Sequence, residues 1–150
     1  MKRRLIALVT VAMVLSLGVL PVLAKKSKKK AEPDRVVVQH FLIAFEKSVK
    51  GKKIERSKKE AGKLAEELYQ RALDGEDFDA LVKEYTNDSY PGIMRLTNKG
   101  APMRGDSRTR DDVVYGFGDL AFSLKVGEIG IVYYGYSSSP YGWHVIKRLE

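Results

Sequence analysis

Cysteine is missing from all 150 residues, and this absence excludes disulfide bonds. It also excludes a lipoprotein anchor, because such an anchor needs a cysteine at the cleavage site. Histidine is scarce, since only His40 and His144 occur. They are too far apart in sequence to form a short metal-binding motif such as two histidines four residues apart. The sequence therefore predicts no metal site and no covalent cross-link.

A surplus of basic charge is absent from most of the chain, although the formal net charge is +8. Eight of the 27 basic residues lie within residues 1–30, and all 19 acidic residues follow Lys30. The remaining 19 basic residues therefore balance the 19 acidic ones. A formally neutral domain does not indicate a nucleic-acid partner. The lysine run Lys25–Lys30 is typical of a solvated linker or of a segment that lies on an anionic membrane surface.

Residues 1–24 begin with Lys2, Arg3 and Arg4, continue as an apolar run and end in Val-Leu-Ala. This layout predicts a signal peptide that is cleaved after Ala24. The alternative is an uncleaved membrane anchor, because an apolar run of about 20 residues can span a bilayer. We expect residues 25–34 to form a basic linker, residues 35–150 to form one domain, and the protein to be exported.

The pattern of apolar residues over 35–150 predicts an α+β domain. Apolar runs predict strands over 35–45, 93–97, 129–136 and 143–149, the last two forming a hairpin. Helical spacing predicts helices over 59–75 and 77–85, with Asp77 as an N-cap and Gly75 as a stop, and a short helix before Gly127. We expect residues 98–112 to form a long exposed loop.

Four segments in this order resemble the parvulin family of peptidyl-prolyl cis/trans isomerases: VVVQHFLIAF, DFDALVKEYTNDS, FGDLAFSLKVGEIG and YGWHVIKRLE. The resemblance covers residues 35–150. It implies a four-stranded antiparallel sheet with about three flanking helices. It also implies activity on proline-containing polypeptides, with no cofactor, and a role in folding exported proteins.

The resemblance also implies a site. His40 and His144 would lie side by side at the sheet centre, either hydrogen bonded or sharing a partner. Asp88 would lie beside them, and Ser139 would complete the polar cluster. The proline pocket would include Phe117, Val113 and Met94, whereas Phe122 would face the core. The family's glycine-rich stretch is reduced here to Gly92.

Physical reasoning shows what such a cluster has to do to speed rotation about an X-Pro bond. Rotation about an X-Pro bond is opposed by amide resonance, with a barrier of about 18–20 kcal/mol, and breaks no bond. A catalyst therefore needs to hold the proline ring and favour the twisted amide. The same fold without turnover would be a chaperone or peptide-binding module. A different hypothesis is that the protein is an adaptor whose basic segment binds a membrane surface, while the domain has no part in that binding.

Overall fold

The computed structural model describes residues 31–150. The predicted signal peptide and most of the predicted linker lie outside these residues. Strand β1 (Arg35–Ala44) is followed by helices α1 (Lys58–Leu73) and α2 (Phe78–Tyr85) and strand β2 (Ile93–Thr97). Then come strand β3 (Arg108–Thr109), the 3₁₀ helix η1 (Arg110–Asp112), helix α3 (Tyr115–Ser123) and strands β4 (Ile129–Val132) and β5 (Gly142–Arg148).

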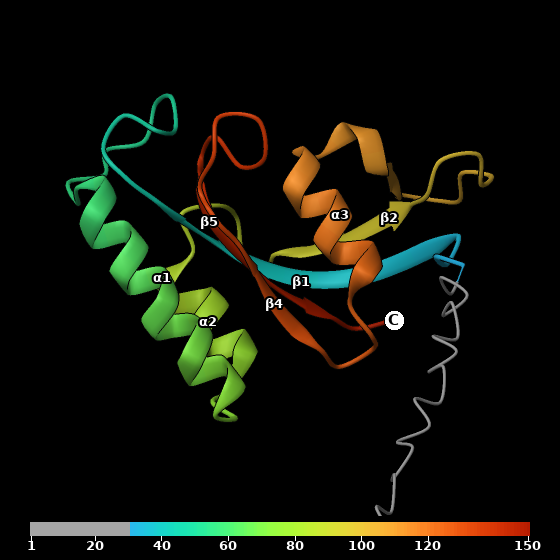
Figure 1. The fold of residues 1–150 in the computed structure, drawn as a ribbon, viewed down its shortest axis with the longest axis horizontal. Helices are drawn as coiled ribbons and strands as arrows, with labels where there is room; N and C mark the ends of the chain where they lie inside the picture. The colour runs from blue at the N-terminus through green and yellow to red at the C-terminus, as the bar shows by residue number, and fades with distance from the viewer. Residues whose placement is uncertain (1–30) are drawn as a thin grey trace, which may run out of the picture. The chain divides into compact units, whose positions relative to one another are not determined.

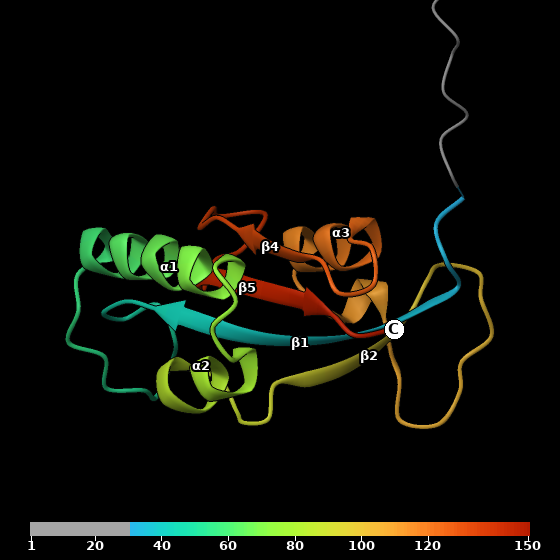
Figure 2. The ribbon, with the colours of Figure 1, turned by 90° about the horizontal axis from the view of Figure 1, so that it is seen from below.

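The described strands form one mixed sheet in the order β3-β2-β1-β5-β4. β1 pairs antiparallel with both β2 and β5, and β4 and β5 form the predicted antiparallel hairpin. Figures 1 and 2 show β1 and β5 running side by side through the middle of the fold. The sheet therefore places β1 and β5, the two strands that carry the histidines, next to each other.

Alternation along the strands separates two apolar cores. On one face, Phe41, Ile43 and Val145 pack against α1 and α2. On the other face, Val36, Val38 and Ile146 pack against α3. Figure 1 shows α1 and α2 together, away from α3. Both faces of β1 are thus covered, which explains why its sequence is an almost continuous apolar run.

Local signals set the helix ends. Ser57 and Glu60 form a capping box at the start of α1, and Gly75 adopts a φ of +98° just after its end. Asp77 caps α2 by accepting a hydrogen bond from the Ala80 N–H at 2.7 Å. The predicted N-cap and the predicted stop are therefore confirmed.

Two details differ from the sequence prediction. The expected sheet of four antiparallel strands has a fifth, β3, which pairs parallel with β2. The segment expected as an exposed loop contains this strand and η1. Its order comes from Arg110, which bonds Glu32 at 2.6 Å and Asp119 at 2.5 Å. Ion pairs of this kind leave no regular spacing of apolar residues in the sequence. Apolar periodicity therefore could not predict the order of this segment.

No helix within residues 31–150 has the length and apolar character needed to cross a membrane.

Candidate active site

A cleft of about 310 Å³ lies on the α3 face of the sheet. Its walls come from β1, β2, β5, α3 and the loops that surround them. The lining residues are His40, Leu42, Val49, Lys52, Asn87, Asp88, Met94, Arg108, Asp112, Val113, Val114, Phe117, Tyr141 and His144. Six of the seven residues predicted for the site lie in this lining, and the seventh, Ser139, bonds His144 from behind.

His40 is buried in β1, with its side chain on the same face as Val38. Its Nδ1 lies 2.8 Å from the Gly92 carbonyl oxygen. Because a carbonyl can only accept, Nδ1 carries a hydrogen and donates it. The backbone N–H of His40 donates to the same oxygen at 2.9 Å. Gly92 therefore fixes both the strand and the ring of His40.

Gly92 can approach this closely only because it lacks a side chain. Its φ is +67°, and a Cβ there would lie 2.2 Å from the carbonyl oxygen of His40. We predicted this glycine only as a remnant of a glycine-rich stretch. Its role as an acceptor was missed, and the turn residues around it in TNDSYPG were the available signal.

Asp88 lies beside the other nitrogen of His40, with its Oδ2 3.3 Å from Nε2. The His40 hydrogen bond holds the pKa of the Asp88 carboxyl below its usual range, so the carboxylate is ionised at neutral pH. With Nδ1 already donating to Gly92, Nε2 is the ring nitrogen that faces the Asp88 carboxylate. The pair therefore places an imidazole nitrogen beside a half-exposed carboxylate at the mouth of the cleft.

The turn that carries Asp88 is tied to β1. The Asn87 N–H donates to the Leu42 carbonyl at 2.8 Å, and the Asn87 Oδ1 accepts from the Ala44 N–H at 2.9 Å. The hydroxyl of Thr86 accepts from the Asp88 N–H at 3.1 Å. These bonds from the Asn87 backbone and side chain and from the Thr86 hydroxyl hold the turn, so the position of Asp88 does not depend on its own half-exposed side chain.

His144 is buried in β5 and has a different set of partners. Its Nδ1 lies 2.9 Å from the Ser139 hydroxyl, which lies 2.7 Å from the Gly142 carbonyl oxygen. The hydroxyl must donate to the carbonyl, so it accepts from Nδ1–H of His144. This fixes the tautomer of His144: Nδ1 carries the hydrogen, and Nε2 carries only a lone pair. Burial, and next the charge on His40, lower the pKa of His144 to about 3.

The two histidine rings lie side by side, with centroids 5.9 Å apart. No hydrogen bond joins them within residues 31–150, and their hydrogen-bond partners differ. Of the two expected arrangements, the direct hydrogen bond is not formed, whereas a shared partner is present. Both rings meet the Phe117 ring in T-shaped contacts, at 4.9 Å for His40 and 5.4 Å for His144. Each Nδ1 is committed to a backbone carbonyl or a hydroxyl, and the Nε2 of His40 faces Asp88.

The apolar side of the cleft is formed by Phe117, Met94 and Val113. Phe117 is almost fully buried and projects from α3 beneath the histidines. Phe122, on the same helix, packs in the core as predicted. Arg108, Asp112 and Tyr141 also line the cleft, and we did not predict them. They come from β3, η1 and the β4–β5 turn, whose positions depend on tertiary contacts.

Groups of three or more acidic or histidine side chains that could hold a metal ion do not occur among the described residues. His40, Asp88 and His144 supply polar groups that can bind and polarise an amide, and Phe117, Met94 and Val113 supply the apolar wall beside them. Such a site suits a reaction in which no covalent bond forms or breaks.

Comparison with known proteins agrees with this geometry. A sequence profile of the PPIC-type PPIase domain matches residues 22–150. The chain therefore belongs to this family of peptidyl-prolyl cis/trans isomerases, the parvulins, and the predicted family and the α+β fold class are confirmed.

Curated relatives include foldases and a chaperone. The foldase protein PrsA of Caldanaerobacter subterraneus subsp. tengcongensis is 39% identical over 85 residues, which cover 57% of this chain and 24% of that protein. The chaperone SurA of Pseudomonas fluorescens is 33% identical over 133 residues, which cover 87% of this chain and 26% of that protein. The chain thus spans about a quarter of the length of these two relatives.

Solved structures show the same fold. The peptidyl-prolyl isomerase ESS1 from Candida albicans superposes with a TM-score of 0.58 at 24% identity, covering 78% of this chain and 63% of that one. The solution structure of TbPIN1 superposes with a TM-score of 0.56 at 22% identity, covering 78% of this chain and 98% of that one.

Proposed function

We propose that the cleft catalyses cis/trans isomerisation of X-Pro bonds in unfolded polypeptides, and that the chain assists the folding of exported proteins. The observation that carries the proposal is that His40 and His144 both contact the buried Phe117 ring, with Asp88 beside His40. Family membership and the foldase relatives support it.

In this mechanism the apolar wall holds the proline ring. Phe117 is the floor, and Met94 and Val113 are the sides. Binding of the ring by apolar surface does not distinguish cis from trans, so it contributes affinity rather than rate. The rate enhancement must come from groups that favour the twisted amide.

Twisting the amide removes its resonance, which makes the nitrogen more basic and the carbonyl less delocalised. His40 and His144 face the reacting bond from neighbouring strands with different hydrogen-bond partners. The Nε2 of His40 lies beside the Asp88 carboxylate, whereas the neutral His144 offers an Nε2 that carries no hydrogen. Asp88 acts on the bond through the field that it creates beside His40. Because these groups are preorganised in a cleft that is partly shielded from solvent, they stabilise the charge rearrangement of the twisted amide more strongly than water does.

Ser139 is a positioning residue in this scheme. It is fully buried behind His144 and does not line the cleft. Its bond to Nδ1 sets the tautomer of His144. The proposed catalytic groups are therefore His40, Asp88 and His144, with Ser139 supporting them.

The experiment that tests the proposal is a prolyl isomerisation assay of the full chain on a panel of X-Pro peptides. Acceleration that is lost in His40→Ala and His144→Ala supports an enzyme. Peptide binding without acceleration would instead make this a non-catalytic peptide-binding module of the same fold.

We infer that residues 1–24 direct export and are cleaved after Ala24, and that the basic run that follows lies on anionic headgroups. The charge layout of these residues supports both inferences. Mass spectrometry of the protein from its native envelope should find Lys25 at the N-terminus, whereas an intact Met1 in the membrane fraction would show an anchor. Liposome pelleting with and without Lys25–Lys30 tests the membrane contact.

A further inference from the structure

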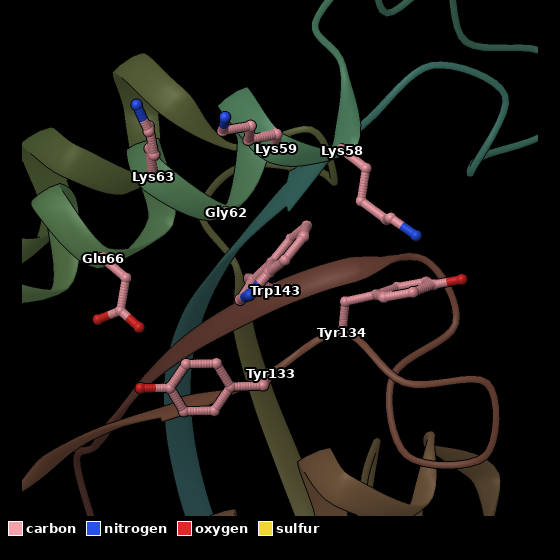
Figure 3. A pocket seen from close by; sticks show the side chains of 8 residues that line it. All are labelled: Lys58, Lys59, Gly62, Lys63, Glu66, Tyr133, Tyr134 and Trp143. Atoms are coloured by element: carbon pink, nitrogen blue, oxygen red, sulfur yellow. The ribbon is translucent and has the colours of Figure 1, made fainter.

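A second concave surface lies on the other face of β5, between α1 and the β4–β5 hairpin. Its volume is about 620 Å³. One wall carries Lys58, Lys59 and Lys63 of α1, and the floor and opposite wall carry Tyr133, Tyr134 and Trp143 (Figure 3). We call it the lysine–aromatic groove. We propose that it binds unfolded polypeptide at segments that combine carboxylates with apolar or aromatic side chains.

The floor of the groove is an aromatic platform. Trp143 stands in the middle of it, with the Tyr134 ring 5.7 Å away and the Phe45 ring 6.2 Å away. Gly62 of α1 makes room for the indole, since a Cβ there would lie 3.0 Å from the Trp143 ring. The indole is half-buried, so part of its face remains open to a ligand. Aromatic surface of this kind gains affinity from apolar and aromatic side chains.

The rim of the groove is positively charged. Lys58 extends over the Tyr134 ring, with its ammonium 5.2 Å from the ring centroid. Figure 3 shows Lys59 and Lys63 projecting from the same helix with their ammonium groups directed away from Trp143. Among the described residues, none of these three ammonium groups forms an ion pair. A carboxylate on a ligand would therefore meet ammonium groups that have no carboxylate of the described residues within ion-pair distance, with Lys58 over Tyr134 and Lys63 acting on Glu60 only at longer range.

The single carboxylate of the groove is already engaged. Glu66 points towards Tyr133 (Figure 3) and accepts a hydrogen bond from its hydroxyl, which raises the pKa of Tyr133. The balance of three lysines against one bonded glutamate favours acidic ligands over basic ones. Charge complementarity thus selects acidic segments, while the aromatic floor selects apolar ones.

The position of Trp143 favours a polypeptide over a membrane. Its indole is only half-exposed and lies between α1 and the two tyrosines (Figure 3), so a single side chain reaches it more readily than a bilayer surface does. An extended segment can lay one side chain on the indole and place a neighbouring carboxylate at the lysine rim. Anionic lipid is therefore the alternative occupant that the experiment has to exclude.

The groove and the cleft are separate sites on the same strand. Trp143 and His144 are neighbours in β5, and their side chains point to opposite faces of the sheet. A segment in the groove leaves the cleft open. Holding one part of an unfolded chain there would raise the local concentration of its prolines at the cleft. The inference goes beyond the proposed function, because binding in the groove does not require that the cleft isomerise prolines.

Trp143 is the sole tryptophan of the chain, and so its fluorescence reports directly on the groove. The full chain is titrated with three short peptides that lack proline and tryptophan and share the same leucine and phenylalanine positions. Their other positions are acidic in one, uncharged in the second and basic in the third. The acidic peptide should shift the fluorescence and bind at least about fivefold more tightly than the uncharged one, and the basic one should bind most weakly. Added salt should reduce these differences.

Two variants with the same change of charge make the comparison specific. The triple variant Lys58→Glu, Lys59→Glu, Lys63→Glu should abolish the preference for the acidic peptide. The matched control is Lys50→Glu, Lys83→Glu, Lys125→Glu, which alters three exposed lysines on other parts of the surface and should keep the preference. Tyr134→Ala should weaken binding of all three peptides. His40→Ala should leave peptide binding in the groove unchanged, which separates this result from the fate of the isomerase proposal.

The proposal is overturned if the three peptides bind equally, or if the two triple variants behave alike. It is also overturned if the Lys58–Lys59–Lys63 variant loses binding to vesicles that contain phosphatidylglycerol but keeps its peptide preference, because the groove would then be a lipid-binding surface. Circular dichroism melts of both triple variants check that the fold is intact.

Discussion

The Nδ1 of His40 donates to the Gly92 carbonyl, whereas the Nδ1 of His144 donates to the Ser139 hydroxyl. The two rings lie next to each other but are held by different parts of the chain. One is tied to the turn before β2, and the other to the β4–β5 turn. The surroundings of the two rings also differ: the Asp88 carboxylate lies beside His40, whereas burial lowers the pKa of His144 to about 3.

The variant Asp88→Ala distinguishes a catalytic role of this carboxylate from a structural one. Asp88→Ala should lower kcat/KM by at least about tenfold, or about 1.4 kcal/mol of transition-state stabilisation, because the charge beside His40 is lost. The fold should survive, since Asn87 and Thr86 hold the turn to β1. By the family resemblance, Asp88→Cys should retain more activity than Asp88→Ala.

Glu84→Ala is the control, because it removes an exposed carboxylate from α2. It should leave kcat/KM unchanged. If Asp88→Ala melts at a lower temperature yet isomerises at the parent rate, Asp88 is a turn residue and its assignment to the site fails.

His144 should make stability depend on pH. Its pKa is about 3 in the folded protein, against an ordinary value of 6.5. Between these values the unfolded chain takes up a proton that the folded protein does not, so folding stability falls as pH falls. The contribution of His144 is constant above about pH 7 and should decline by about 2 kcal/mol from pH 7.5 to pH 5.

Urea unfolding of the parent and of His144→Gln across this range measures the effect. The parent should lose stability and the variant, which cannot titrate at this position, should lose much less. Parallel curves for the two proteins would show that His144 is not protected from protonation by the fold.

Gly92 should tolerate substitution far less than another glycine of similar conformation. Gly92→Ala would place a Cβ against the His40 carbonyl, so it should cost more than about 2 kcal/mol and displace His40. Gly75 also has a positive φ, but a Cβ there meets nothing within 4 Å. Gly75→Ala should therefore cost only about 1 kcal/mol of backbone strain.

Thermal melts compare the two variants at equal conditions. Equal losses would mean that backbone conformation, and not the close approach to His40, explains the need for glycine at position 92.

The fold follows largely from local patterns in the sequence. The β1 segment, the Asp77 cap and the β4–β5 hairpin are each encoded by neighbouring residues, and all are present. β3 was missed because two residues in a parallel pair give no alternation to detect. The strand predicted over 129–136 ends at Val132, after which the chain turns towards Ser139.

The site is encoded less locally. The family pattern identified His40, Asp88 and His144 because their neighbours in sequence are distinctive. It also placed Ser139 in the polar cluster, but it gave no way to know that Gly92 and Ser139 take up the two Nδ1 atoms. Those contacts depend on turns that approach the sheet from distant parts of the chain, and a single sequence does not specify such distances.

The most direct test of the central claim is cis/trans exchange of a proline peptide with the parent chain and with His40→Ala, each checked by a thermal melt. NMR exchange spectroscopy measures the rate without a coupled protease. We predict that the parent accelerates exchange at catalytic concentrations and that folded His40→Ala loses at least about tenfold of this rate. A parent chain that binds the peptide at the cleft while exchange continues at the uncatalysed rate would contradict the account.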